Sequence, residues 1–155
     1  MKKERKTARQ ILSVNAREVI AVGPDDTVLA ALHLMADKDV TTVLVLQGSN
    51  LAGVLSQRDY ARKVEVLGRD AAHTRVGEIM TTQVFYVTPE HTCDECPSLM
   101  HTKRIRHLPV IESGRVVGVL SNSDLLEELF QEDEHFIQLL ERDMLYLTID
   151  TGGAY

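Results

Sequence analysis

The order of apolar and polar positions at the start of the chain predicts a short strand followed by a helix. Residues 18–22 form an apolar run that ends at Gly23-Pro24. Thr27 then stands where a helix N-cap is expected, because the apolar residues after it recur at helical spacing. These residues are Val28, Ala31, Leu32, Leu34 and Met35.

The period then changes to that of extended chain. Residues 42–46 and 51–55 are two nearly continuous apolar runs, separated by the turn residues Gly48-Ser49-Asn50. Such a pair of runs around a short turn predicts a β-hairpin. The next polar residue, Ser56, is predicted to begin a second helix.

The same order of elements returns 65 positions later. The stretch Val22-Gly23-Pro24-Asp25-Asp26-Thr27 aligns with Val87-Thr88-Pro89-Glu90-His91-Thr92, and Gly53-Val54-Leu55-Ser56-Gln57-Arg58-Asp59 aligns with Gly118-Val119-Leu120-Ser121-Asn122-Ser123-Asp124, with no gap between them. The second copy predicts a strand over 84–87, a helix from Thr92 to about Lys103, strands over 107–111 and 115–120, and a helix from Ser121. The chain therefore contains two copies of one structural unit.

These elements predict an α+β fold in which two βαββα repeats pack as a pseudo-two-fold pair. Strands that are apolar on both faces need helices to cover them, so each half should depend on the other. We expect one module over residues 1–155, with repeats at 12–67 and 75–130 and a C-terminal helical extension at 131–155.

Two short segments precede the repeats, and a longer one follows them. Residues 7–12 predict a short helix that leads into the first strand, and residues 75–80 take the same place before the second repeat. A stripe at helical spacing continues into the tail and must be buried on the module or across a dimer. It comprises Leu125, Leu126, Leu129, Phe130, Phe136, Ile137, Leu140, Met144 and Leu145.

Composition narrows the classes of partner. The net charge of −6 disfavours nucleic acid, and the one basic cluster, residues 2–6, is read first as a solvated terminus. Apolar runs stay well short of the ~20 residues of a membrane span, so we expect no membrane insertion and a cytoplasmic protein. Two cysteines are then expected to be thiols.

The repeated Gly-Val-Leu-Ser-x-x-Asp motif has two interpretations. Ser56 with Asp59, and Ser121 with Asp124, match a helix capping box, which needs no ligand. The same positions are suited to an anion or to the vicinal hydroxyls of a ribose. The repetition of the motif in the same place favours ligand binding by at least one copy, with capping as a concurrent role.

The repeat resembles a known family. The tandem βαββα units, the Val-x-Pro-x-x-Thr stretches, Arg104-Ile105-Arg106-His107-Leu108-Pro109-Val110 and the two Ser-x-x-Asp motifs resemble a pair of cystathionine-β-synthase (CBS) domains, a Bateman module, and in particular small bacterial stand-alone CBS pairs. The resemblance implies that aspartate binds ribose, serine binds ribose or phosphate, and adenine lies between strands. It also implies that each aspartate faces the strand region of the other repeat.

Two unequal sites follow from this resemblance. The first site would use Ser56, Arg58 and Asp59 with Ile105, His107 and the approach at Thr81, and the second would use Ser121, Ser123 and Asp124 with Val40, Thr42 and Ile20. Arg58, Arg62 and Lys63 would let the first site prefer the more highly charged ligand, although a solvated helix face explains these three cations equally well.

A rival chemistry lies in Cys93 and Cys96, which histidines flank. Cys-x-x-Cys is a pattern of zinc and redox sites. The repeat alignment, however, places the two cysteines over Val28 and Ala31, which are inward positions of a helix. We therefore favour packing over metal or redox chemistry.

The expected function is that of a regulatory module and not of an enzyme. It would need no cofactor, would bind AMP, ADP, ATP or NAD between the repeats as a regulatory ligand, and would pass its occupancy to an unknown regulated protein. The resemblance also favours a homodimer. A constitutive protein-protein interaction module with vestigial pockets is the alternative, and a cysteine-based redox or metal sensor is a third.

Overall fold

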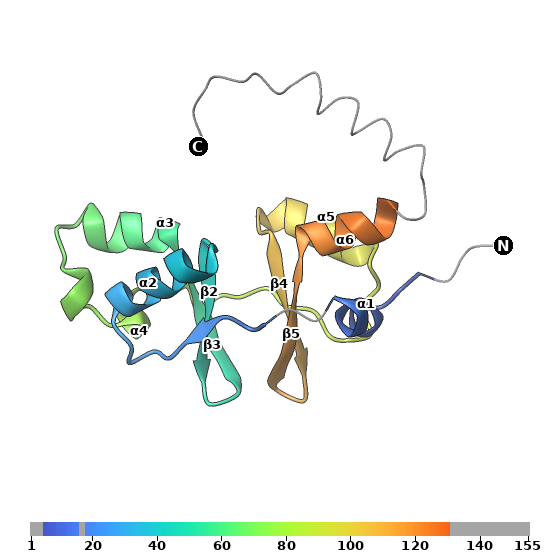
Figure 1. Cartoon of the computed structure of the whole chain (residues 1–155), viewed down its shortest axis with the longest axis horizontal. Coiled ribbons are helices and arrows are strands. Elements are labelled where there is room, and N and C mark those ends of the chain that lie inside the picture. Colours follow the sequence, from blue (N-terminus) through green and yellow to red (C-terminus); the bar gives the residue numbers. More distant parts are fainter. Residues whose placement is uncertain (1–4, 16–17, 131–155) are drawn as a thin grey trace, which may run out of the picture.

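The fold consists of two lobes side by side, each a small sheet covered by helices (Figure 1). It is given by a computed structural model, which describes residues 5–15 and 18–130. The first lobe contains β1 (Ala21–Val22), α2 (Val28–Lys38), β2 (Thr42–Gln47), β3 (Asn50–Ser56) and α3 (Gln57–Tyr60). The second contains α5 (Glu95–Lys103), β4 (His107–Glu112), β5 (Arg115–Ser121) and α6 (Asn122–Phe130). The predicted α+β fold of two repeats is confirmed, while the predicted tail 131–155 lies outside the described residues.

The two hairpins repeat each other in their strand pairing. β2 pairs antiparallel with β3, β4 pairs antiparallel with β5, and each ladder carries one irregularity, at Val45/Leu46 and at Val110/Ile111. The turns differ, because Gly48 (φ 66°) is matched by Ser113 (φ 52°), whereas Gly114 (φ 77°) is matched by Ser49, which does not have a positive φ. The ladders of the two hairpins are therefore equivalent, and their turns are not.

The first strand differs between the lobes. β1 pairs in parallel with β2, but the strand predicted over 84–87 is reduced to a single parallel bridge between Val87 and Val110. In the first lobe the N–H of Leu44 donates to the carbonyl of Ile20 at 3.1 Å. Pro109 occupies the position matching Leu44 and has no N–H, so this ladder bond cannot form. The prediction of a strand at 84–87 was wrong for this reason.

The helix predicted from Thr92 begins later, at Glu95. The N–H of Thr92 does donate to the carboxylate of Glu95, at 3.1 Å. The Thr92 hydroxyl donates to Asp94 instead of accepting from the helix, so only one of the two hydrogen bonds of a capping box forms. In the first lobe Thr27 does cap α2, accepting from the N–H of Ala30 at 3.1 Å.

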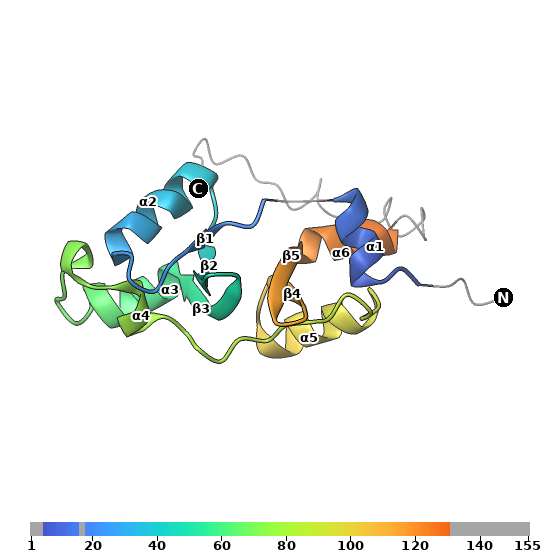
Figure 2. The same ribbon diagram turned by 90° about the horizontal axis from the view of Figure 1, so that it is seen from below.

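The short helices that precede the repeats exchange lobes. α1 (Ala8–Val14) packs on the second lobe, where the N–H of Ala8 donates to the carbonyl of His91 at 2.8 Å. α4 (Val76–Ile79) packs on the first, where the N–H of Val76 donates to Asp26 at 2.8 Å. Figure 2 shows α1 beside α6 and α4 near α2 and α3. Each lobe is therefore completed by the segment that leads into the other.

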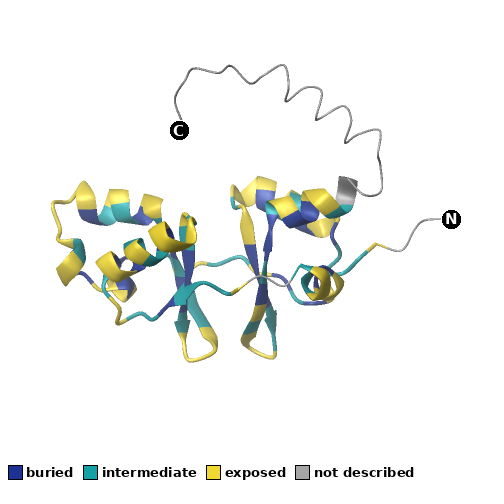
Figure 3. Cartoon of the chain, viewed as in Figure 1, coloured by how far each residue is buried: buried dark blue, intermediate teal, exposed yellow. Residues whose placement is uncertain are grey.

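The apolar core is divided in the same way. One buried cluster contains Val28, Val45 and Leu55 with Val76 and Ile79 of α4, and the other contains Leu108, Leu120 and Leu125 with Ala8 and Ile11 of α1. Cys93 and Cys96 belong to the second cluster, as the repeat alignment predicts. Buried residues lie on the facing sides of strands and helices, and the hairpin tips are exposed (Figure 3).

Candidate functional site

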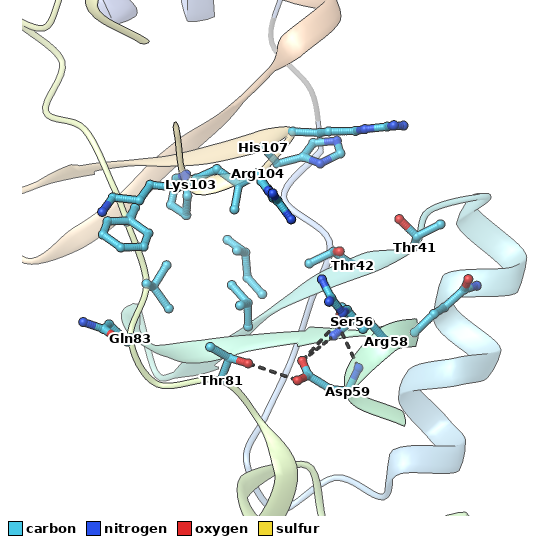
Figure 4. Close-up of a pocket in the computed structure, with 18 residues that line it drawn as sticks. Thr41, Thr42, Ser56, Arg58, Asp59, Thr81, Gln83, Lys103, Arg104 and His107 are labelled. Carbon is cyan, nitrogen blue, oxygen red and sulfur yellow. Dashed lines mark hydrogen bonds between the residues drawn. The ribbon is translucent and has the colours of Figure 1, made fainter. Parts of the chain in front are cut away.

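A cavity of about 690 Å³ lies between the two lobes beside Asp59. One wall comes from β2, β3, α3 and the segment 81–85, and the other from residues 103–109 (Figure 4). The residues that line it are Thr41, Thr42, Leu44, Val54, Ser56, Gln57, Arg58, Asp59, Thr81, Gln83, Val84, Phe85, Lys103, Arg104, Ile105, Arg106, His107 and Pro109.

Asp59 is held by a capping box at the start of α3. Its Oδ2 accepts from the N–H and the hydroxyl of Ser56, both at 3.1 Å, while its own N–H donates to Ser56 Oγ. Its Oδ1 accepts from the hydroxyl of Thr81 at 3.1 Å and lies 3.0 Å from Nζ of Lys63. The carboxylate, whose residue is only 9% exposed, thus has donors at all of about four acceptor positions.

Most of the residues predicted for the first site lie together. Ser56, Arg58, Asp59, Thr81, Ile105 and His107 all line the cavity. Thr42, predicted for the second site, lines this cavity as well.

Two predicted cations do not line the cavity. Lys63 pairs with Asp59 at 3.0 Å and donates to the carbonyl of Ile79 at 2.9 Å, and Arg62 is exposed. The prediction that these two residues face the ligand is therefore not supported by their positions, because both lie on η1 (Ala61–Glu65), a π-helical turn that continues beyond the cavity.

The cavity has other cations that the sequence analysis did not assign to it. Lys103, Arg104 and Arg106 come from the opposite lobe, and Lys103 Nζ lies 4.7 Å from the centroid of the Phe85 ring. Among the described residues, no carboxylate pairs with Arg58, Arg104 or Arg106. The basic stretch 103–107 was the sequence signal that could have identified these cations. Whether they line the cavity depends on which lobe the stretch faces.

The second motif is more enclosed. Asp124 is 2% exposed and Ser121 4%, and Asp124 Oδ2 accepts from the N–H of Ser121 at 3.1 Å. Ser121 Oγ lies 2.9 Å from Ser123 Oγ. Val40 and Ile20, predicted to line this site, pack against the core of the first lobe.

Charge separates the two motifs further. Asp39 stands at the position matching Arg104, and both residues end a helix in the left-handed region at φ 54°. Ser123 matches Arg58 and Thr41 matches Arg106, so Arg58, Arg104 and Arg106 have no basic residue at the matching position, whereas Lys103 is matched by Lys38.

The thiols have the properties of core residues. Burial raises the pKa of the Cys96 thiol to about 11 from an ordinary value of 9.0, with the nearby Glu95 carboxylate adding to the effect. The described residues contain no group of three His, Cys, Asp or Glu side chains placed to hold a metal ion. In the same residues no helix has the length and apolar character needed to cross a bilayer.

Comparison with known proteins agrees with this architecture. The CBS domain family matches residues 9–66 and 76–131. The chain belongs to the CBS-domain family. It is 36% identical over 121 residues to the mitochondrial CBS domain-containing protein CBSX3 of Arabidopsis thaliana, covering 75% of this chain and 59% of that protein. It is 32% identical over 108 residues to the CBS domain-containing protein YhcV of Bacillus subtilis, covering 70% and 76%.

Solved CBS structures share the fold. The CBS domain NE2398 superposes with a TM-score of 0.75 at 38% identity, over 82% of this chain and 99% of that one. A CBS-domain protein from Burkholderia ambifaria gives a TM-score of 0.74 at 40% identity, over 83% and 96%. Hypoxic response protein I, whose structure contains two coordinated zinc ions, gives 0.69 at 28% identity, over 79% and 98%.

Proposed function

We propose that this CBS pair is a regulatory module that binds an adenosine-containing nucleotide in the cavity beside Asp59 and passes its occupancy to a partner protein. The observation that supports this most directly is the pairing of a carboxylate on one wall with cations on the other. A ribose diol donates to carboxylates, and phosphates accept from guanidinium groups in charge-assisted bonds. Apolar side chains between them, including Leu44, Val54 and Ile105, offer a surface for the base.

The proposal favours an anionic nucleotide over a neutral or cationic ligand. Arg58, Arg104 and Arg106 have no described carboxylate partner, so a ligand phosphate would meet guanidinium groups that are not already neutralised. We accordingly propose that the cavity beside Asp59 takes the more highly charged ligand, as the sequence analysis predicts, with Arg104 and Arg106 in place of Arg62 and Lys63.

Calorimetry with a graded set of ligands tests the proposal. Adenosine, AMP, ATP, NAD and S-adenosylmethionine share the adenosine group and differ in charge. We expect ATP to bind more tightly than adenosine, and Arg104→Asn to weaken ATP by roughly tenfold while leaving adenosine unchanged. Asn accepts the left-handed conformation of position 104, so the variant should fold.

Asp39→Asn is the matched control, because position 39 is the equivalent left-handed helix end of the other repeat. It should leave ATP affinity unchanged. Equal losses for ATP and adenosine in Arg104→Asn would exclude a phosphate contact at this residue.

One observation favours a second function. The Asp59 carboxylate already has four donors from its own chain, which is what a vestigial pocket in a constitutive interaction module would show. Thermal denaturation separates the two functions, since a ligand at 100 times its dissociation constant stabilises by about 2.7 kcal/mol. No shift with any of the five ligands would favour the interaction module.

Assembly is part of the proposal. We propose a homodimer with a regulated protein as its partner. A hexameric CBS-CP12 protein from cyanobacteria, 27% identical with a TM-score of 0.67, shows that a related fold does assemble from several copies. Sedimentation of the full chain with and without ATP would measure both the oligomeric state and its dependence on ligand.

A further inference from the structure

Lys63 joins the Asp59 carboxylate to the connector between the lobes, defined here as residues 79–81. Its Nζ lies 3.0 Å from Asp59 Oδ1 and donates to the carbonyl of Ile79 at 2.9 Å. The hydroxyl of Thr81 donates to the same Oδ1 at 3.1 Å. Asp59 is therefore linked to both ends of the connector: to Ile79 through the ammonium group of Lys63, and to Thr81 through its neutral hydroxyl.

The connector is itself fixed to the sheet of the first lobe. Thr81 and Val54 exchange two backbone hydrogen bonds, each of 2.9 Å. A Cβ at Gly53 would come within 2.7 Å of the Thr81 carbonyl oxygen, so glycine permits this close approach. A change at Asp59 thus acts on a segment that leads directly from one lobe to the other.

The second repeat cannot form this arrangement. The position matching Lys63 is Glu128, whose carboxylate pairs with Lys6 at 2.9 Å, and the position matching Thr81 is Ala16. An acid and an alanine at these positions supply neither donor to Asp124. The tie is thus a feature of the first repeat and not a general result of the duplicated motif.

We propose that Lys63 is a positioning residue, which holds the Asp59 carboxylate for a ligand diol and couples its occupancy to the connector. The inference rests on the nucleotide-binding function proposed above. Ligand hydroxyls that reach Asp59 must replace donors already there. The neutral hydroxyl of Thr81 is the weaker of the two donors on Oδ1, so it exchanges first, while the charge-assisted bond to Lys63 persists. Binding therefore changes how the connector is held without releasing the carboxylate.

The test compares Lys63→Met with Arg62→Met in the full chain. Both variants remove one positive charge from adjacent residues, but Arg62 is exposed and lies outside the cavity. The probe is adenosine, which is neutral, so a change in net charge alone does not alter its binding. Calorimetry measures its affinity, and hydrogen exchange measured by mass spectrometry follows peptides covering 79–86 with and without it.

We expect Lys63→Met to lower the affinity for adenosine several-fold and to speed hydrogen exchange of the connector in the free protein. Arg62→Met should match the wild type in both measurements. Adenosine should change connector exchange in the wild type, where Thr81 gives up its bond to Asp59. Lys63→Arg should restore affinity and connector exchange, and a cooperative thermal transition in Lys63→Met would show that its losses do not come from unfolding.

The inference is overturned if Lys63→Met and Arg62→Met agree in both affinity and exchange. It is also overturned if adenosine binds the wild type without changing connector exchange. If no ligand binds the wild type, the nucleotide-binding function fails and the ligand-coupling step fails with it. In that case, comparison of hydrogen exchange of the connector in ligand-free Lys63→Met and Arg62→Met still shows whether Lys63 holds the connector.

Discussion

At the scale of single residues, the same Ser-x-x-Asp motif has two different environments. Asp59 lines a cavity and is bonded to the connector through Thr81, whereas Asp124 is almost fully buried beside Ser121. Both carboxylates accept the backbone N–H that begins their helix. Capping is therefore common to both, and the cavity described above lies beside the first.

Alanine at the two aspartates should separate these roles. Asp59→Ala removes both the cap and the proposed ribose contact, so stability should fall by roughly 0.5–2 kcal/mol, and AMP affinity should fall by at least about tenfold. Asp124→Ala should lower stability and leave affinity at the Asp59 cavity nearly unchanged. Urea denaturation and calorimetry measure the two quantities. Unchanged AMP affinity in Asp59→Ala would remove this residue from the proposed site.

The Cys96 thiol predicts a dependence of stability on alkaline pH. Burial raises its pKa to about 11, so the unfolded chain loses this proton near the ordinary value of 9.0 while the folded chain keeps it. The unfolded state then binds fewer protons, and unfolding becomes easier as pH rises through this window. Below pH 9.0 the thiol is protonated in both the folded and the unfolded state, so Cys96 causes no loss of stability there.

Urea denaturation at about pH 8 and about pH 10 measures this effect. The wild type should lose more stability than Cys96→Ala between the two conditions. Equal losses in the two proteins would show that Cys96 is not responsible.

How far the sequence predicts the site is clear from individual residues. Ser56 and Asp59 could be found because their spacing is a local property of a helix start. Arg104 and Arg106 were missed although the family resemblance had assigned their neighbours Ile105 and His107 to this site, because the sequence does not show which side chains of this stretch face the cavity. Lys63 was predicted as a cation of the pocket, and the structure places its Nζ 3.0 Å from Asp59 Oδ1 but not among the residues that line the cavity.

At the scale of elements, the repeats predict the hairpins well and the leading segments less well. The alternation of apolar runs and turns determines both hairpins locally. The exchange of α1 and α4 between lobes is a long-range pairing, visible only once the backbone bonds of Ala8 and Val76 are known. The lost strand at 84–87 could have been anticipated, since Pro109 lacks the N–H that Leu44 supplies.

Two equivalent glycines allow a test of how tightly the elements pack. A Cβ at Gly53 would lie 2.7 Å from the backbone oxygen of Thr81, whereas one at Gly118 would lie 2.8 Å from the end of the Leu12 side chain. A side chain can rotate away, but the paired connector cannot. Gly53→Ala should therefore cost about 1–3 kcal/mol in the free energy of unfolding, and Gly118→Ala clearly less. Chemical denaturation that gave the reverse order would contradict the close approach of the connector.

At the scale of the whole molecule, exchange of the leading helices makes the two lobes depend on each other. Ile11 of α1 is 2% exposed in the second lobe, and Val76 and Ile79 of α4 are 0% and 2% exposed in the first. Burial of side chains of this size contributes about 1.5–3 kcal/mol each. A lobe separated from its exchanged helix therefore loses an appreciable part of the 5–15 kcal/mol that is typical of a folded protein.

Division of the chain at two places tests this dependence. A break after residue 68 leaves α4 with the second lobe, while a break after residue 82 leaves α4 with the first lobe that it covers. Fragment 1–82 should therefore show a more cooperative thermal transition by circular dichroism than fragment 1–68, because only the longer one keeps Val76 and Ile79 in its core. Fragments 1–68 and 69–155 should each gain structure when mixed, since each carries the helix that the other lacks. If 1–68 melted as cooperatively as 1–82, the contacts of α4 would be incidental to the first lobe, and the coupling between the connector and the Asp59 cavity would lose its structural basis.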